Sequence, residues 1–205
     1  MFANRTDAGR KLAQQIPRNS DSLVLAIPRG GVVVGDVISK MIGCSLDIAI
    51  SKKITPPGFP EYAIGAVACD GTIYKGKYWA KFSDNPQLAD EISSKRNEVR
   101  NRLERYRGHM NYDIENKRVI LVDDGIATGS TVLAILKWIE KQHPKKIILA
   151  VPVMPFDTLE KMKTMVDDVI TLETPKNFSS VSQFYDDFSQ VSESQVMQIL
   201  RKYHL

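Results

Sequence analysis

Nearly continuous apolar runs alternate along this chain with stretches in which apolar residues recur every three or four positions. The runs are rich in Val, Ile and Leu, as buried parallel strands are, and they cover residues 22–27, 46–51, 118–123, 146–153 and 166–172. The periodic stretches predict helices at residues 7–16, 33–41, 86–107, 129–142, 157–165 and 192–203, with Thr6 as the N-cap of the first. This alternation predicts an α/β fold with a doubly wound parallel sheet.

Two segments depart from that pattern. Prolines and a glycine in residues 52–62 predict a loop, and residues 63–76 predict two short strands that turn at Asp70-Gly71. Residues 175–188 are irregular and aromatic. We therefore expect one domain over residues 1–205, with a flexible loop and β-hairpin at about 52–76 and a C-terminal hood at about 174–205.

Composition narrows the function classes only slightly. The 205 residues suit one α/β domain, and 43% hydrophobic and 25% charged residues are ordinary for a soluble protein. Two cysteines suggest no disulfide framework, so a reducing cytoplasmic location is expected, and no apolar run is long enough for a membrane span or a signal peptide. The net charge of +4 is compatible with anionic small molecules or with nucleic acid and selects neither. Acids interrupt the basic helix near residues 95–109, so no nucleic-acid partner is expected.

The most informative stretch is VILVDDGIATGST, residues 119–131. An apolar strand ends in Asp123 and Asp124, and a loop of small and hydroxyl residues leads into a helix. Unpaired N–H groups at a helix N-terminus, together with the helix dipole, form a phosphate site. Two carboxylates can accept hydrogen bonds from neighbouring sugar hydroxyls and offset positive charge on the sugar. A ligand that carries both a ribose and a phosphate satisfies both parts.

Two other nucleotide motifs are absent. The chain has no GxxxxGK[ST] sequence and no GxGxxG sequence, so neither a P-loop nor a dinucleotide fingerprint is predicted.

The 119–131 motif resembles the signature that binds phosphoribosyl pyrophosphate (PRPP) in type I phosphoribosyltransferases. The resemblance implies transfer of the 5-phosphoribosyl group from PRPP to a nitrogenous base or amine, with release of pyrophosphate, in nucleotide metabolism. It implies Asp123 and Asp124 as catalytic residues. It also implies a ribose and 5-phosphate site made of Asp123, Asp124, Gly125, Ile126, Ala127, Thr128, Gly129, Ser130 and Thr131.

A second strand-to-loop junction, AIPRGG at residues 26–31, corresponds to the family's pyrophosphate loop. Arg29 has a planar fork for phosphate oxygens, and Gly30 and Gly31 can offer backbone N–H groups. By itself such a glycine turn is weak evidence, because glycine commonly marks turns.

The segment at residues 52–74 resembles the family's mobile loop, whose closure would exclude water from the reacting sugar. Lys52 and Lys53 could neutralise the departing pyrophosphate, Lys53 also as a catalytic residue, and Glu61 is the candidate general base. Each of these residues could instead belong to a solvated loop.

The acceptor is the least defined part of the resemblance. Hypoxanthine-guanine enzymes carry an Asp that contacts the purine where this chain has Ala127, whereas adenine enzymes have Ala there. Phe178, Phe184 and Tyr185 could stack on a base, or could simply pack in the core.

The resemblance extends over nearly the whole chain, from NRTDAGRKLA near the start to FSSVSQFYDDF near the end, and matches a branch of the family without a defined acceptor. Arg5 and Asp7, in the first of these stretches, could be structural or could line the site. The family implies Mg²⁺ held mainly by PRPP itself, with no metal ligands from the protein, and a homodimer by analogy. The alternatives are a PRPP or nucleotide sensor without turnover and an enzyme with an unusual amine acceptor.

Overall fold

The computed structural model describes residues 1–56, 58–59 and 62–203 of the chain. The chain divides into two compact units, the first built from Met1–Ile48, Ile114–Thr128 and the residues from His143 onward, and the second from Ala49–Asp113 and Gly129–Gln142. The segment predicted as an insert at about 52–76 lies in the second unit, which also takes in residues on either side of it.

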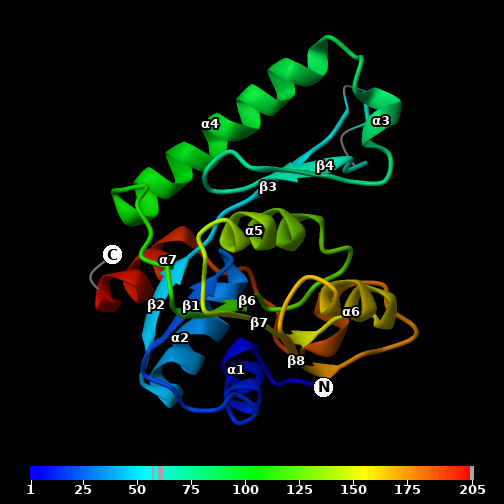
Figure 1. The fold of residues 1–205 in the computed structure, drawn as a ribbon. Helices are drawn as coiled ribbons and strands as arrows, with labels where there is room; N and C mark the ends of the chain where they lie inside the picture. The colour runs from blue at the N-terminus through cyan, green and yellow to red at the C-terminus, as the bar shows by residue number, and fades with distance from the viewer. Residues whose placement is uncertain (57, 60–61, 204–205) are drawn as a thin grey trace. The chain divides into compact units, whose positions relative to one another are not determined.

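The first unit is built on a five-stranded sheet in which every neighbouring pair of strands is parallel (Figure 1). Its strands are β1 (Ser22–Ala26), β2 (Ser45–Ile48), β6 (Arg118–Val122), β7 (Lys146–Val153) and β8 (Asp168–Glu173). The predicted α/β fold with a parallel sheet is therefore confirmed.

The strand order is β2-β1-β6-β7-β8, so the order reverses between β1 and β6. Ala26 pairs with Val122 at the carboxyl ends of these two strands. In open α/β sheets ligands collect in the crevice at such a reversal. The two loops that the sequence marks for phosphate and sugar follow directly from β1 and β6.

Among the described residues, the α-helices of the first unit are α1 (Arg5–Ala13), α2 (Gly30–Ile42), α6 (Phe156–Lys163) and α7 (Glu193–Leu200). Helices α1 and α2 pack against each other and lie side by side in Figure 1. The first helix begins earlier than predicted, because the Asn4 side chain, and not Thr6, accepts from the Asp7 N–H as the N-cap. Short 3₁₀ helices lie before and after α7, at η1 (Val181–Phe184) and η2 (Arg201–Tyr203).

The second unit contains an antiparallel sheet of β3 (Lys52–Ile54), β4 (Gly65–Val67) and β5 (Ile73–Lys75). The hairpin turning near Asp70-Gly71 is confirmed, but the loop prediction is wrong at 52–54, where β3 pairs with β4. Among the described residues of this unit, the helices are α3 (Trp79–Phe82), α4 (Gln87–Arg107) and α5 (Ser130–Glu140), and α3 was not predicted. Across the part of the chain that the structure describes, no helix is both long and apolar enough to cross a membrane.

Candidate functional site

The two predicted loops meet where β1 and β6 end. The Ile27 N–H donates to the Val122 carbonyl over 2.8 Å, which carries the pairing of the strands into the loops. A Cβ on Gly31 would lie 2.9 Å from the Asp123 Cα, so the backbones of the two loops touch. The peptide bond between Pro28 and Arg29 is cis. The residues predicted for pyrophosphate thus adjoin those predicted for the ribose.

Asp123 is an acid in an unfavourable position for its own charge. Burial, and then the negative charge of Asp124, raise its pKa well above the ordinary value of an aspartate, while the Asp124 N–H and the positive charge of Arg5 partly oppose this shift. One of its oxygens, Oδ1, accepts from the Asp124 N–H over 2.8 Å. The carboxyl is therefore held in place by its neighbour's backbone.

Asp124 is held by a cation from a distant part of the chain. Arg5 Nε donates to Asp124 Oδ2 over 2.6 Å, and the two side chains are only 11% and 16% exposed. Gly30 lies against this ion pair, because a Cβ there would overlap the Asp124 carboxylate and lie 2.6 Å from Arg5 Nε. The pair, together with Gly30, joins the first helix to both loops.

The C-terminal segment also reaches Asp124. The Tyr185 hydroxyl donates to the Asp124 carbonyl over 2.6 Å, and the Tyr185 ring packs on Phe2 and Phe188 with ring centres 5.3 and 4.8 Å apart. Burial, and then the negative charge of Asp124, raise the pKa of Tyr185, so this phenol stays protonated as a donor.

The three aromatic residues predicted to stack on a base have partners of their own. Phe178 and Phe184 stack on each other with centres 5.8 Å apart and planes inclined by 19°. Tyr185 is buried in the cluster with Phe2. Each ring therefore packs against another aromatic side chain of the first unit.

Two backbone groups of the loop after β6 form hydrogen bonds with other parts of the chain. The Ile126 N–H donates to the Val153 carbonyl, and the Ala127 carbonyl accepts from the Thr158 hydroxyl over 2.7 Å. Of the predicted phosphate-binding stretch, Ala127 and Thr128 are exposed. Gly125 and Gly129 have positive φ angles of 156° and 73°, and Gly129 is the N-cap of α5.

Lys52 and Lys53 are consecutive residues of β3, so their side chains point to opposite faces of that strand. Lys52 Nζ lies 3.0 Å from Glu98 Oε2 in α4, whereas the Lys53 side chain is exposed. Glu61, the predicted general base, lies outside the described residues.

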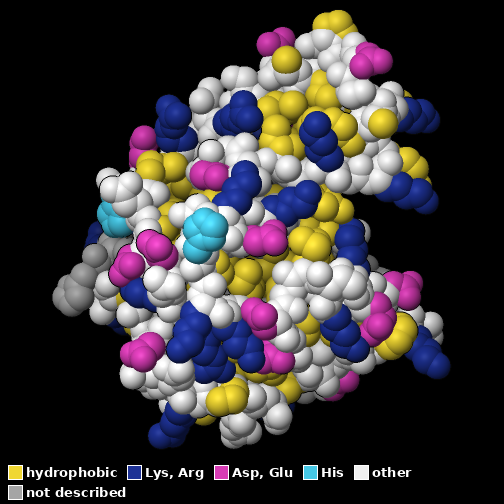
Figure 2. Space-filling model, in the orientation of Figure 1, with side chains coloured by type: hydrophobic (Ala, Val, Ile, Leu, Met, Phe, Trp, Pro, Cys, Tyr) yellow, Lys and Arg dark blue, Asp and Glu magenta, His cyan; other side chains and the backbone are white. Residues whose placement is uncertain are grey.

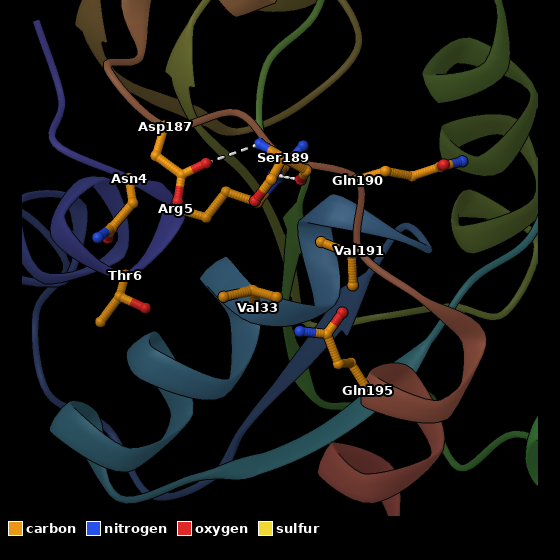
Figure 3. Close-up of a pocket in the computed structure, with 9 residues that line it drawn as sticks. All are labelled: Asn4, Arg5, Thr6, Val33, Asp187, Ser189, Gln190, Val191 and Gln195. Atoms are coloured by element: carbon orange, nitrogen blue, oxygen red, sulfur yellow. Dashed lines mark hydrogen bonds between the residues drawn. The ribbon is translucent and has the colours of Figure 1, made fainter.

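A cavity of about 220 Å³ borders the Arg5 side chain in the first unit (Figure 3). It lies between the start of α1, the first turn of α2 and the segment that leads into α7. Its lining is mostly polar and comprises Asn4, Arg5, Thr6, Val33, Asp187, Ser189, Gln190, Val191 and Gln195.

On the face drawn in Figure 2, basic and acidic side chains are interspersed. Among the described residues, no three His, Cys, Asp or Glu side chains gather as candidate metal ligands.

Sequence reasoning left the role of Arg5 open and did not assign any to Phe188. The one local signal is the position of Arg5 at the first residue of a helix, where the helix dipole disfavours a cation unless an anion lies nearby. The anion is Asp124, 119 positions along the chain.

Comparisons with known proteins agree on one family. The model of the phosphoribosyl transferase domain matches residues 3–189. A protein of Mycobacterium tuberculosis H37Rv, provisionally named a phosphoribosyl transferase, is 33% identical over 214 aligned residues. The alignment covers 100% of this chain and 47% of that protein, so the chain spans about half the length of this curated relative.

Solved structures show the same fold. The crystal structure of TT1426 from Thermus thermophilus is 34% identical, with a TM-score of 0.84 over 98% of each chain. A hypoxanthine phosphoribosyltransferase from Staphylococcus aureus is 12% identical, with a TM-score of 0.50 over 85% of this chain and 74% of its own. The second likeness concerns the fold alone.

Proposed function

This chain belongs to the family of phosphoribosyl transferase domains, and we propose that it transfers the 5-phosphoribosyl group of PRPP to a nitrogen acceptor. The observation that carries the proposal is the meeting of the two loops at the reversal of strand order. There the acids after β6 adjoin Gly30 and Gly31 after β1. A ligand that spans both loops carries sugar hydroxyls at one and pyrophosphate at the other.

Asp123 and Asp124 accept hydrogen bonds from the ribose hydroxyls in this proposal. Their negative charge also stabilises the oxocarbenium-like sugar that forms as the bond from C1 to pyrophosphate breaks. The N–H groups and hydroxyls of residues 128–131, at the start of α5, bind the 5-phosphate. Arg29, with the N–H groups of Gly30 and Gly31, takes the pyrophosphate.

The acceptor nitrogen forms the new bond to C1 and gives up a proton, for which Glu61 is the proposed base. Lys53, exposed on β3, is the better placed of the two lysines to meet an anion, because Lys52 is paired with Glu98. Mg²⁺ supplies charge neutralisation when it is bound through the oxygens of PRPP. The paired acids suit such a substrate-held ion, since they lie beside the loop proposed for pyrophosphate.

The acceptor is inferred from the surroundings of the two loops. The hood's aromatic rings are engaged with one another, while the cavity beside Arg5 is lined mainly by polar side chains. The panel of acceptors should therefore include small polar amines as well as purine and pyrimidine bases.

A sensor that binds PRPP without turnover is the second candidate, because Ala127 stands at the place of the purine-contacting acid and is compatible with either a sensor or an enzyme. The deciding experiment incubates the protein with PRPP, Mg²⁺ and each acceptor in turn, and measures the release of pyrophosphate. Release that depends on one acceptor supports the transferase. PRPP binding without release across the whole panel would favour the sensor.

A further inference from the structure

Arg5 makes three separate contacts, and each engages a different part of its guanidinium. Its Nε donates to Asp124 Oδ2 over 2.6 Å, and its Nη1 donates to the Ser189 carbonyl over 2.8 Å. The centre of the guanidinium lies 3.8 Å above the centre of the Phe188 ring. Figure 3 shows Arg5 reaching from α1 to Ser189 on the C-terminal segment. The guanidinium is therefore held at one face and at two positions on its edge.

The segment that holds Arg5 also holds the backbone of Asp124. Phe188 packs on Tyr185, whose hydroxyl donates to the Asp124 carbonyl. That segment is itself paired with the N-terminal end of the chain, since the Phe2 N–H donates to the Phe184 carbonyl and the Asp186 N–H to the Phe2 carbonyl. Asp124 is thus held at its carboxylate and at its carbonyl by residues from opposite ends of the sequence.

Arg5 fixes one carboxylate oxygen of Asp124. Oδ2 receives Arg5, and Gly30 lies against the same oxygen, while the Asp123 and Asp124 side chains are also hydrogen-bonded to each other. A carboxylate locked in this way keeps a fixed orientation. That is the arrangement needed to accept a hydrogen bond from a sugar hydroxyl without first reorienting.

We propose that Arg5 is a positioning residue for PRPP: it orients the Asp124 carboxylate for the ribose. This inference rests on the proposed function. Arg5 itself does not touch the ribose in this arrangement, and acts through Asp124 and the C-terminal segment.

Because the acid pair titrates, the positioning role of Arg5 should appear in the pH dependence of the affinity for PRPP. Among the described residues, the titratable groups that face Asp123 are the Asp124 carboxylate, the Arg5 guanidinium and the Tyr185 hydroxyl, which stays neutral. Of these side chains, Arg5 is the one whose charge lowers the pKa of Asp123, so its loss raises that pKa further. A hydroxyl donates well only to the ionised acid, so the affinity for PRPP decreases as the pH falls and Asp123 becomes protonated. Without Arg5 this decrease should begin at a higher pH than in the wild type.

The test uses Arg5→Met, Arg5→Lys and the control Arg10→Met, which removes an exposed cation from the same helix. The dissociation constant of Mg²⁺–PRPP is measured by calorimetry from pH 5.5 to 9. Arg5→Met should weaken binding about 10- to 100-fold at pH 7, the usual cost of one charge-assisted hydrogen bond, and should move the pH midpoint upward. Arg5→Lys should keep the midpoint near that of the wild type but recover only part of the affinity, because lysine lacks the planar fork. Arg10→Met should match the wild type.

Unchanged affinity in Arg5→Met would overturn the inference while leaving the proposed function standing. Equal weakening at every pH, with an unmoved midpoint, would also overturn it, since this is the result for a residue that only stabilises the fold. If Arg5→Met does not fold, wild-type affinity in Arg5→Lys contradicts the positioning role. Failure of the wild-type protein to bind PRPP would instead overturn the proposed function, which separates the two failures.

Discussion

The end of β6 and strand β3 both carry charged side chains proposed for one substrate, but the two regions hold them differently. At the end of β6, Asp124 is fixed by Arg5 from α1 and by Tyr185 from the C-terminal segment. On β3, the contact of Lys52 is an ion pair with Glu98 on a neighbouring helix, one-third exposed, and Lys53 is open to solvent.

The comparison distinguishes side chains whose positions are fixed by neighbouring residues from side chains that can change conformation when a ligand binds. Asp123 is kept in surroundings that disfavour its charge, and a protein keeps such a group at a cost in stability. Lys53 is exposed, and its long side chain can reach an anion only after losing conformational freedom. Substitutions at the end of β6 should therefore have large and specific effects, and substitutions on β3 small ones.

The largest effect is expected for Asp123→Asn combined with Asp124→Asn. Two charge-assisted hydrogen bonds to the ribose are lost, so the affinity for PRPP should fall at least about 100-fold. Competition with labelled PRPP measures the loss, and far-ultraviolet circular dichroism checks the fold. Asp21→Asn, an exposed acid of the same unit, is the control. An affinity within a few-fold of the wild type would contradict the assignment of these acids to the PRPP site.

Asp123→Asn alone should raise the melting temperature at pH 7 to 8. The pKa of Asp123 is raised on folding. Its contribution to the free energy of unfolding is therefore fully present below the ordinary pKa of an aspartate, and is lost as the pH rises through the raised value. An uncharged Asn keeps that stability, and each kcal/mol gained corresponds to about 2–4 °C in a chain of this size. The gain should vanish below about pH 4, where the acid is protonated in both states. A lower melting temperature at pH 8 would mean that Asp123 is stabilised as an anion.

Arg29→Ala should distinguish the two ends of the ligand. If Arg29 binds the pyrophosphate, affinity for pyrophosphate should drop about 10- to 100-fold, while affinity for ribose 5-phosphate stays nearly constant. Calorimetric titration of each ligand separately measures this, with the exposed Arg18→Ala as control. Equal weakening of both ligands would place Arg29 elsewhere.

The smallest effects are expected on β3. Lys53→Met should weaken pyrophosphate binding by a few-fold, about what one exposed charge contributes, and Lys52→Met should change it less. Because the two side chains lie on opposite faces of the strand, the pair serves as its own matched comparison. A larger effect for Lys52 would show that its ion pair with Glu98 opens when the ligand binds.

The order of elements in the first unit follows from hydrophobic periodicity, as β7 illustrates. Its eight residues form one nearly uninterrupted apolar run between charged and turn segments, and the predicted bounds, 146–153, coincide with the strand. Strand β3 was missed because three residues of mixed polarity carry no period of their own, and only pairing with β4 makes them a strand.

The candidate site divides in the same way. Asp123, Asp124 and the loop that follows them are contiguous, so they form a sequence motif from which their chemistry can be predicted. Arg5 and Phe188 reach the same acid from the two ends of the chain, and no local pattern encodes a contact between residues 119 positions apart. Aromatic residues near the C-terminus suggested base stacking, but aromatic composition cannot tell whether a ring faces a ligand or another ring.

In the proposed function, the loops after β1 and β6 bind PRPP together. The deciding measurement is calorimetric titration of PRPP into the wild-type protein with Mg²⁺ at pH 8, followed by the same titration into protein already saturated with pyrophosphate or with ribose 5-phosphate. We predict saturable binding of PRPP at one site per chain, weakened by each of the two competitors. Absence of binding, or binding that neither competitor weakens, would mean that the two loops do not form one PRPP site.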